Sequence, residues 1–380
     1  MIKLRGIAWD HVRGFAPLVA TSKEFQQRNS ELSIIWDKHS LKDFEDFPVE
    51  ILAETYDLIL LDHPSIGENV KKGVIVPLDE WISSSVLEEQ AQNSVGPSYQ
   101  SYHWEGHQWA FAIDAAAQVS AYRSDLLNRM DLSVPTTWDE VLNLVSKLPK
   151  TIKMAIPLNS THAFCSFLTI YSNFNNSNSV DSIETQLAME VLDLLQFLSN
   201  QTHAELRYSN PIQVLDRMSS TNDIAYVPII FGYCNYSQAN FRTFPIHFAD
   251  IPSKQQTPIG GVLGGVGLAI SAHSKHIEAA CQYAEFVSNV QSQQGTYFTS
   301  GGQPGHLQAW SNTRINELSN HFFARTIHTM EGASMRPRAA GSIHLQEQAG
   351  QSIHRFLSGQ QTCLDTAQSI CQLFDAILTK

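Results

Sequence analysis

The amino-terminal part of the chain alternates between short apolar runs and one amphipathic stretch. Apolar runs at 2–9, 31–37 and 56–62 predict three strands, and the stretch at 15–28 predicts a helix between the first two. This order is typical of a parallel sheet that helices cover on both faces. We therefore expect an α/β fold in which ligands meet the loops at the carboxyl ends of these strands.

The stretch Trp109–Leu127 separates this part from the rest of the chain. It reads WAFAIDAAAQVSAYRSDLL, an apolar run that meets a lone acid at Asp114 and continues with small and apolar residues to Tyr122. The pattern predicts one strand, a short crossing segment and a second strand that runs into a helix start. A crossing between two separately packed lobes is a natural place for a ligand cleft, so Asp114 is a candidate cleft or hinge residue.

Helical and strand patterns alternate again after this stretch. Thr137 and Glu140 have the spacing of a capping box that begins a helix, and leucines at helical spacing over 187–198 predict a second helix that faces a core. Short strands are expected near 154–157 and within 223–237. The glycine-rich stretch 257–271 lacks the ending of a phosphate-binding loop, and we interpret it as a bend at a second crossing.

Aromatic and polar residues stand together at the ends of the predicted strands. Those on the amino-terminal side of the crossing are Trp9, Asp10, His11, Trp36, Asp37, Asp62 and His63. Those beyond it are Asn159 in a polar loop before an apolar helix, and Tyr226, Phe231, Tyr233 and Tyr236 in and after a strand. Flat aromatic faces beside carboxylates suit sugars, heterocycles and cations. The alternative is structural, with Asp and Asn as helix caps and the aromatic rings as packing at sheet ends.

Two later segments carry further candidates. The GGQPG turn at 301–305 is expected to expose Gln303, His306 and Trp310 toward the same cleft. Arg336 and Arg338 flank a proline, and such a pair either binds a carboxylate bidentately or pairs with an internal acid.

Length and charge narrow the class of protein. A chain of 380 residues predicts two or three domains. The net charge of −12 and the lack of a basic run make nucleic acids and anionic membranes poor partners. No stretch approaches the roughly 20 apolar residues that span a bilayer. Met1 leads directly into a strand-like run without a signal-peptide pattern, so we expect either a cytoplasmic protein or an exported one whose signal is missing from the sequence.

The cysteines and histidines give no sign of a metal or cofactor. Five cysteines without CxxC spacing argue against a disulfide framework and a structural zinc site, and the fifteen histidines are scattered. Cys281 and Cys371 lie on helical patterns and are expected in a core. We therefore predict no metal and no cofactor.

An enzyme is the main alternative from another class. Its nucleophile would have to be Cys165 or Cys234, with His162, Asp62 or Asp114 as the base. Nothing in the spacing shows such a pair, so no catalytic residue is predicted.

Four segments in this order resemble the family 1 extracellular solute-binding proteins, the maltose-binding-like receptors of ABC importers. They are GHQWAFAIDAAAQVSAYRSDLL, VPTTWDEVLNLVSKL, SAHSKHIEAACQYAEFVSN and SGGQP. The resemblance implies a type 2 periplasmic-binding-protein-like fold, with two lobes of mixed sheets flanked by helices and a ligand cleft between them. It also implies that the lobes close about a hinge.

From the resemblance we expect an N-terminal lobe of 1–112 plus about 260–305 and a C-terminal lobe of 113–259 plus about 306–380. It implies a periplasmic or extracellular monomer that captures a small polar molecule, by default a carbohydrate, for an ABC importer permease. The alternatives are a nitrogen heterocycle or a cation as ligand, a cytosolic sensor, or a transferase on the same scaffold. The expected ligand-binding residues are Trp9, Asp10, His11, Trp36, Asp62, His63, Asp114, Asn159, Tyr226, Tyr233 and Gln303.

Overall fold

The computed structural model describes residues 1–255 and 257–378, and the chain divides into two compact units. Unit 1 consists of Met1–Ala116, Gly264–Ile315 and Arg338–Ala340. Unit 2 consists of Ala117–Leu263, Asn316–Pro337 and Gly341–Lys380. Each unit is therefore built from three separate stretches of the chain.

The sheet of unit 1 is mixed. Its strands are β1 (Ile2–Trp9), β2 (Leu32–His39), β3 (Leu58–Leu61), most of β10 (Leu263–Ile270) and the first part of β6 (Phe111–Tyr122). As predicted, β1 pairs in parallel with both β2 and β3, whereas β10 runs antiparallel to β3. A small hairpin of β4 (His103–Trp104) and β5 (His107–Gln108) lies outside this sheet.

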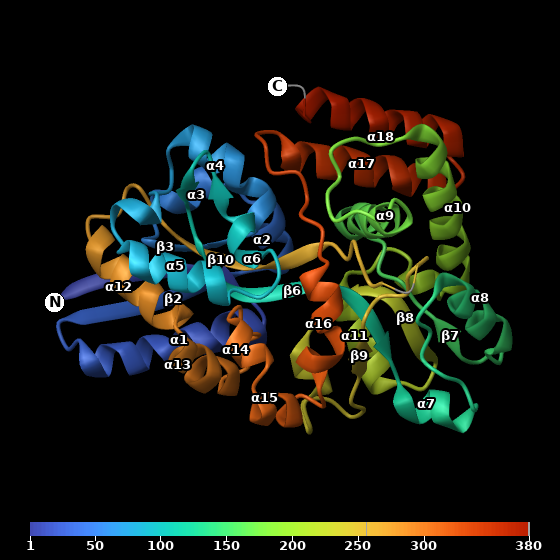
Figure 1. Ribbon diagram of the computed structural model, residues 1–380, viewed down its shortest axis with the longest axis horizontal. Helices are drawn as coiled ribbons and strands as arrows, with labels where there is room; N and C mark the ends of the chain where they lie inside the picture. The colour runs from blue at the N-terminus through green and yellow to red at the C-terminus, as the bar shows by residue number, and fades with distance from the viewer. Residues whose placement is uncertain (256, 379–380) are drawn as a thin grey trace. The chain divides into compact units, whose positions relative to one another are not determined.

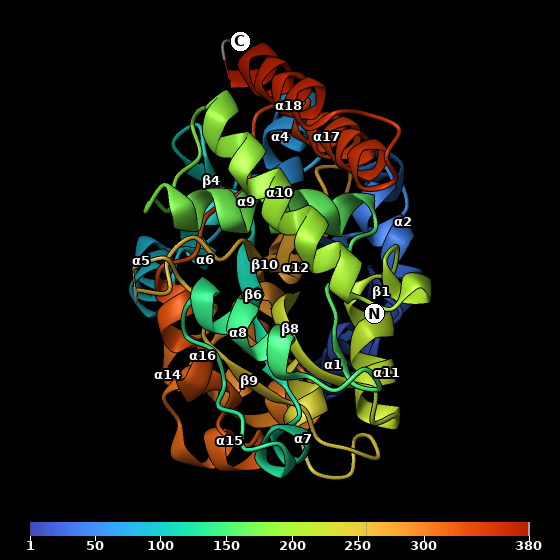
Figure 2. The ribbon, with the colours of Figure 1, turned by 90° about the vertical axis from the view of Figure 1, so that its right-hand side faces the viewer.

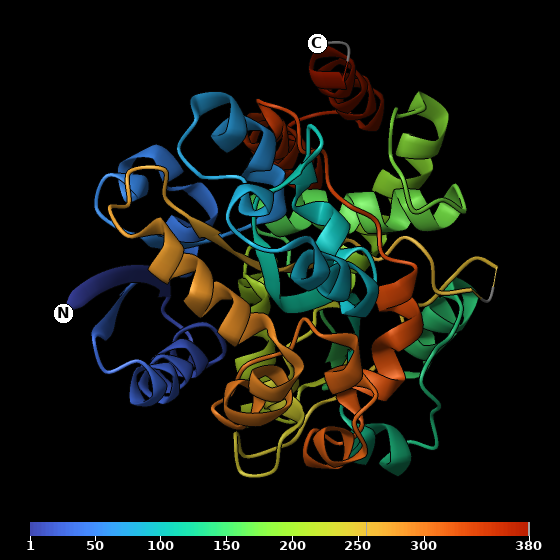
Figure 3. The same ribbon diagram turned by 60° about the vertical axis from the view of Figure 1, so that its left-hand side comes forward.

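Helices cover both faces of the unit 1 sheet. One face carries α1 (Val12–Arg28) and α12 (Ile277–Ser288), which share a hydrophobic cluster with Leu4 and Ala8 of β1 (Figure 3). The other face carries α3 (Val49–Ala53) and α4 (Ile66–Lys72), which pack on Ile7 of the same strand (Figure 1). Since successive side chains of a strand point to opposite faces, both sides of β1 must be apolar.

Shorter helices complete unit 1. They are α2 (Leu41–Asp46), η1 (His63–Ser65), η2 (Leu78–Glu80), α5 (Ser84–Asn93), α6 (Ser98–Ser101), α13 (Val290–Ser292), η5 (Gln293–Tyr297), α14 (Leu307–Trp310) and the first half of α15 (Thr313–Leu318).

In unit 2 the second part of β6 pairs antiparallel with β8 (Ile224–Phe231) and β9 (His247–Ala249), and β7 (Lys153–Met154) runs parallel to β8. The helices are α7 (Ser124–Arg129), α8 (Trp138–Lys147), α9 (Ser160–Phe174), α10 (Thr185–Gln201), η3 (Ala204–Leu206), α11 (Pro211–Ser220), η4 (Cys234–Ser237), α16 (Phe322–Glu331), α17 (Ser342–Leu357) and α18 (Cys363–Leu378).

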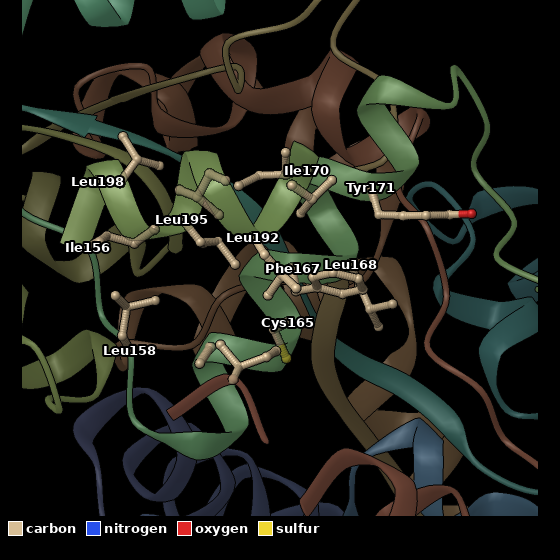
Figure 4. Packing of buried hydrophobic residues seen from close by; sticks show 14 of the residues in the cluster. Ile156, Leu158, Cys165, Phe167, Leu168, Ile170, Tyr171, Leu192, Leu195 and Leu198 are labelled. Carbon is tan, nitrogen blue, oxygen red and sulfur yellow. The ribbon is translucent and has the colours of Figure 1, made fainter. Parts of the chain in front are cut away.

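The core of unit 2 lies mainly between β8 and a group of long helices. Figure 2 shows α9, α10, α17 and α18 packed together. Figure 4 shows how Phe167 and Leu168 of α9 meet Leu192 and Leu195 of α10 inside this cluster. Helix α9 is buried along almost its whole length because neighbours surround it on several sides.

Most predicted elements are confirmed. The predicted strand at 2–9 is β1, the helix at 15–28 belongs to α1, and β8 lies within 223–237. The capping box is present: the Thr137 side chain accepts from the backbone N–H of Glu140, and the Glu140 side chain accepts from the backbone N–H of Thr137. Cys281 is buried in the unit 1 core as expected, whereas Cys371 is half-buried and packs against the unit 2 core.

Three expectations are wrong. The stretch Trp109–Leu127 does not hold two strands, because β6 runs without interruption for 12 residues, all of them buried. No glycine or proline interrupts it. Trp36 does not follow its strand, because β2 continues to His39. The strand expected near 154–157 contains only Lys153 and Met154.

No helix in the described part of the chain is long and apolar enough to cross a membrane.

Candidate functional site

The turn from β1 into α1 presents three of the predicted residues. Trp9 ends the strand, and the His11 ring caps the helix by accepting the Arg13 backbone N–H at 3.1 Å through Nδ1. The Trp9 ring lies flat over the first turn of α1, because a Cβ on Gly14 would come within 2.4 Å of it. Its other neighbour is Phe44, with ring centroids 5.3 Å apart. The turn is therefore shaped around the indole.

The indole N–H of Trp9 is a buried donor. The residue is only 3% exposed, and its Nε1 has no hydrogen-bond partner among residues 1–255 and 257–378. Leaving a buried donor unsatisfied costs about 1–3 kcal/mol. An oxygen atom of a bound ligand would remove that cost.

The end of β3 presents a second polar group. The Asp62 carboxylate accepts the His63 backbone N–H at 2.9 Å and lies 3.1 Å from Nδ1 of the same residue, whose ring is buried. The Tyr102 ring meets the imidazole edge-on, with centroids 6.5 Å apart. Because Ile7 pairs with Ile59 in the parallel register, the ends of β1 and β3 lie level with each other. The structure thus brings the Trp9–His11 turn and the Asp62–His63 pair to one edge of the sheet.

Asp114 forms a buried ion pair with Arg13. The Arg13 Nε donates to one carboxylate oxygen at 2.8 Å, and Nη2 donates to the other. Burial raises the pKa of Asp114, and the charge and hydrogen bonds of Arg13 oppose that rise. The two-bond geometry is that of an ionised carboxylate with a guanidinium. Arg13 is not among the residues predicted from the sequence, because its partner Asp114 lies 101 positions away.

The expectation that the GGQPG turn exposes its polar residues is wrong, because Gln303, His306 and Trp310 are all buried. The Gln303 amide donates to the Ala115 carbonyl oxygen at 2.8 Å. His306 caps α14 and places Nε2 3.1 Å from Glu89, while Trp310 donates to the Pro304 carbonyl oxygen. Gln303 and His306 therefore attach the turn to β6 and α5, and Trp310 closes it from within.

Of the two other unit 1 candidates, one is an exposed residue of the same turn and the other lies inside the core. Asp10 is exposed and pairs with Lys38 at 2.7 Å. Trp36 is a core residue rather than a strand-end group: its indole N–H donates to Ser22 Oγ at 2.8 Å, and its ring packs on Gly6. A strand interior covered by α1 and α12 explains this position.

Most of the unit 2 candidates have structural roles. The Asn159 side chain caps α9 by accepting the His162 backbone N–H at 3.0 Å, which is the structural alternative considered from the sequence. Tyr226 is completely buried within the core under β8. Tyr233 follows β8 and meets the Tyr236 ring edge-on, with centroids 6.3 Å apart. Tyr233 is thus the unit 2 candidate that lies in a loop.

The two arginines around Pro337 belong to different units. Arg336 Nη1 donates to Gln346 Oε1 at 2.9 Å in unit 2. In unit 1, Arg338 Nη1 donates to the carbonyl oxygens of Gln100, Ser101 and His103, and its guanidinium lies 5.3 Å from the centre of the Trp104 ring. Main-chain carbonyls therefore replace the acid that was expected for Arg338.

Other parts of the molecule show fewer features of a binding or catalytic site. A surface hollow of about 450 Å³ in unit 1 is lined by Ile2, Trp81 and the start of α12, at the amino end of β1 and away from Trp9. Cys165 and Cys234 are both buried. Within the described residues, no three His, Cys, Asp or Glu side chains gather as metal ligands.

Comparison with known proteins identifies the family to which the chain belongs. The family model described as bacterial extracellular solute-binding protein matches residues 23–294. This range covers most of unit 1 and the greater part of unit 2.

Solved structures share the fold over the whole chain. Maltose-bound MalE3 of T. maritima has a TM-score of 0.86 at 16% identity, covering 99% of this chain and 100% of that one. An ABC transporter solute-binding protein of Thermotoga lettingae bound with α-D-tagatose has a TM-score of 0.83 at 17% identity, with 100% of both chains covered. One from Agrobacterium radiobacter K84 in complex with ribitol has a TM-score of 0.77 at 18% identity, with 100% and 98% covered. The α/β fold with mixed sheets flanked by helices is thereby confirmed.

Proposed function

Because the chain belongs to the family of bacterial extracellular solute-binding proteins, we propose that it captures a carbohydrate or polyol for an ABC importer. The ligand class is supported by three structurally similar proteins that bind maltose, α-D-tagatose and ribitol. Hydroxyl-rich molecules also suit the edge where β1 and β3 end, since they both donate and accept hydrogen bonds.

The observation that carries this proposal at the level of the site is the buried indole N–H of Trp9. A ligand hydroxyl oxygen would accept from it, and the nearby Asp62 and His63 would fix further hydroxyls. We propose Trp9, His11, Asp62 and His63 in unit 1 as the residues that touch the ligand, whereas Tyr233 in unit 2 packs on Tyr236.

The remaining predicted residues have supporting roles in this proposal. Asp114 holds Arg13, Asn159 caps α9 and Gln303 holds the strand at Ala115. Asp10 pairs with Lys38, and Trp36 and Tyr226 belong to the hydrophobic cores.

The family also supports a cellular context. We propose that the protein acts in the periplasm or outside the cell, as a monomer, and delivers its ligand to a permease without transforming it. In this proposal two lobes close about a hinge, and the binding energy of the ligand favours the closed state.

A thermal-shift screen tests the function. The panel contains maltose, α-D-tagatose and ribitol, with amines and nitrogen heterocycles as the competing class. A ligand at a hundred times its Kd stabilises the native state by about 2.7 kcal/mol, which raises the melting temperature. We expect at least one sugar or polyol to raise it. A rise with amines or heterocycles alone would overturn the carbohydrate proposal.

A further inference from the structure

Strand β6 is fixed to unit 1 as far as Ala115. The Ala115 backbone N–H donates to the Gln303 carbonyl oxygen at 3.3 Å, and the Ala115 carbonyl oxygen accepts from Gln303 Nε2 at 2.8 Å. One residue earlier, Arg13 holds Asp114. All of these groups belong to unit 1 and are buried.

From Ala117 onward the same strand is fixed to unit 2. The Ala117 carbonyl oxygen accepts from the Gly232 backbone N–H at 3.2 Å. Gln118 is held twice, because its backbone N–H donates to the Val262 carbonyl oxygen at 2.9 Å and its side-chain Oε1 accepts from Thr169 Oγ1 at 2.5 Å. The change of partners therefore takes place across one residue, Ala116.

The neighbouring strand β10 shows the same change. In unit 2, the Leu263 backbone N–H donates to the Ser334 carbonyl oxygen at 2.8 Å. In unit 1, Gly265 has a φ of +102° and approaches Asp114 so closely that a Cβ would lie 2.3 Å from its carbonyl oxygen. Gly264 stands between these two anchors, and glycine is the residue that best tolerates a change of backbone angles.

We propose that Gln303 and Gln118 are positioning residues that confine bending of β6 to Ala116, with Gly264 as the matching point in β10. This inference rests on the proposed function, because only a receptor that closes needs a defined bending point. A side-chain bond from Gln303 to a buried main-chain oxygen is costly to break, so Ala115 resists movement. A hinge of this kind absorbs its φ and ψ changes within a few residues.

The test measures the distance between one label in each unit of the ligand-free full-length protein. The labels replace two exposed residues, Glu88 in unit 1 and Asp193 in unit 2. Each label is attached to an introduced ketone-bearing residue, because the five native cysteines would react with thiol-specific labels. The variant Gln303→Leu removes the side-chain bond to the Ala115 carbonyl oxygen and leaves the backbone bond between the two residues in place. Its matched control is Gln293→Leu, since Gln293 is equally buried in unit 1 and makes two backbone bonds, to Val287 and Gly305.

We expect Gln303→Leu to broaden and shift the distance distribution, whereas Gln293→Leu leaves it as in the wild type. An equal effect of the two variants, or no effect of Gln303→Leu, would overturn the proposal.

A second pair keeps the test decisive if Gln303→Leu folds poorly. Ala116→Gly adds backbone freedom at the proposed bending point and is expected to broaden the distribution. Ala112→Gly makes the same change in the same strand inside unit 1 and is expected to leave it unchanged. Equal distributions for these two variants would contradict the inference.

These measurements need no ligand. Loss of the carbohydrate proposal in the thermal-shift screen is therefore separate from loss of the bending point.

Discussion

Two buried arginines stand near the two ends of β6, and they are neutralised in opposite ways. In unit 1, Arg13 pairs with Asp114, which is 1% exposed, so that the positive charge is balanced by a buried negative charge. In unit 2, Arg123 donates to the carbonyl oxygens of Met218 and Thr221 and to the half-exposed carboxylate of Asp125.

The charge of Arg13 is balanced by one buried carboxylate, whereas that of Arg123 is shared among several acceptors. Removing Asp114 leaves a buried guanidinium without its carboxylate, whereas Arg123 keeps several neutral acceptors and the Phe244 ring, whose centre lies 4.0 Å from its guanidinium carbon. The unit 1 pair also adjoins the Trp9–His11 turn through Arg13, so its integrity bears on the proposed ligand site. The unit 2 arrangement joins the start of α7 to the end of α11.

The largest expected effect is that of Asp114→Asn. Removing one partner of a buried ion pair costs about 3–5 kcal/mol, because the other charge stays buried. Chemical denaturation of wild type and variant measures this loss. The double variant Arg13→Met/Asp114→Leu removes both charges and is expected to recover much of the stability. An Asp114→Asn protein as stable as the wild type would contradict the assigned ion pair.

A smaller effect is expected for the unit 2 candidate Asn159. Asn159→Ala removes the cap of α9 and is expected to cost about 1 kcal/mol in unfolding free energy. Asn159→Ser keeps a capping oxygen and is expected to restore stability, and Thr137→Ala provides a matched loss at the cap of α8. Loss of ligand affinity in a fully stable Asn159→Ser variant would instead make Asn159 a ligand residue.

The smallest effect is expected at Asp125. The hydrogen bond from Arg123 lowers the pKa of Asp125, so the unfolded chain binds the proton more readily. The stabilisation is present above the unfolded value of about 3.9 and is lost as the pH falls through the folded pKa.

Urea unfolding at neutral pH and near pH 3 checks this sign. Asp125→Asn is expected to be less stable than the wild type by less than about 1 kcal/mol at neutral pH, since the carboxylate is half exposed. The difference in stability between the wild type and Asp125→Asn should become smaller near pH 3. A gap that widens on acidification would contradict the assigned pair.

The sequence predicted elements better than side-chain positions. Periodicity located β1, α1 and α10, and the Thr137 capping box was readable because its partners are three residues apart. Trp36 was misplaced, since a strand end cannot be read to within two residues when the apolar run continues into polar positions. Those predictions depend on short-range patterns alone.

Hydrogen-bond partners that lie far apart in the chain could not be predicted from the sequence. The bond from Arg13 to Asp114 joins residues 101 positions apart, and that from Gln303 to Ala115 joins residues 188 positions apart. A GGQPG turn suggests exposure because glycine and proline usually lie at the surface. Here the turn is packed beside β6, where Pro304 bridges to Asp114. No spacing rule carries that information.

The central claim is that the edge formed by β1 and β3 in unit 1 binds a hydroxyl-rich ligand through the Trp9 indole N–H. Isothermal titration of the sugar or polyol that gives the largest thermal shift tests it in Trp9→Phe. Trp36→Phe is the matched control, because its indole N–H already donates to Ser22. We predict that Trp9→Phe weakens binding about tenfold, as expected for one lost hydrogen bond, while Trp36→Phe binds like the wild type. Unchanged binding in Trp9→Phe, or an equal loss in both variants, would contradict the account.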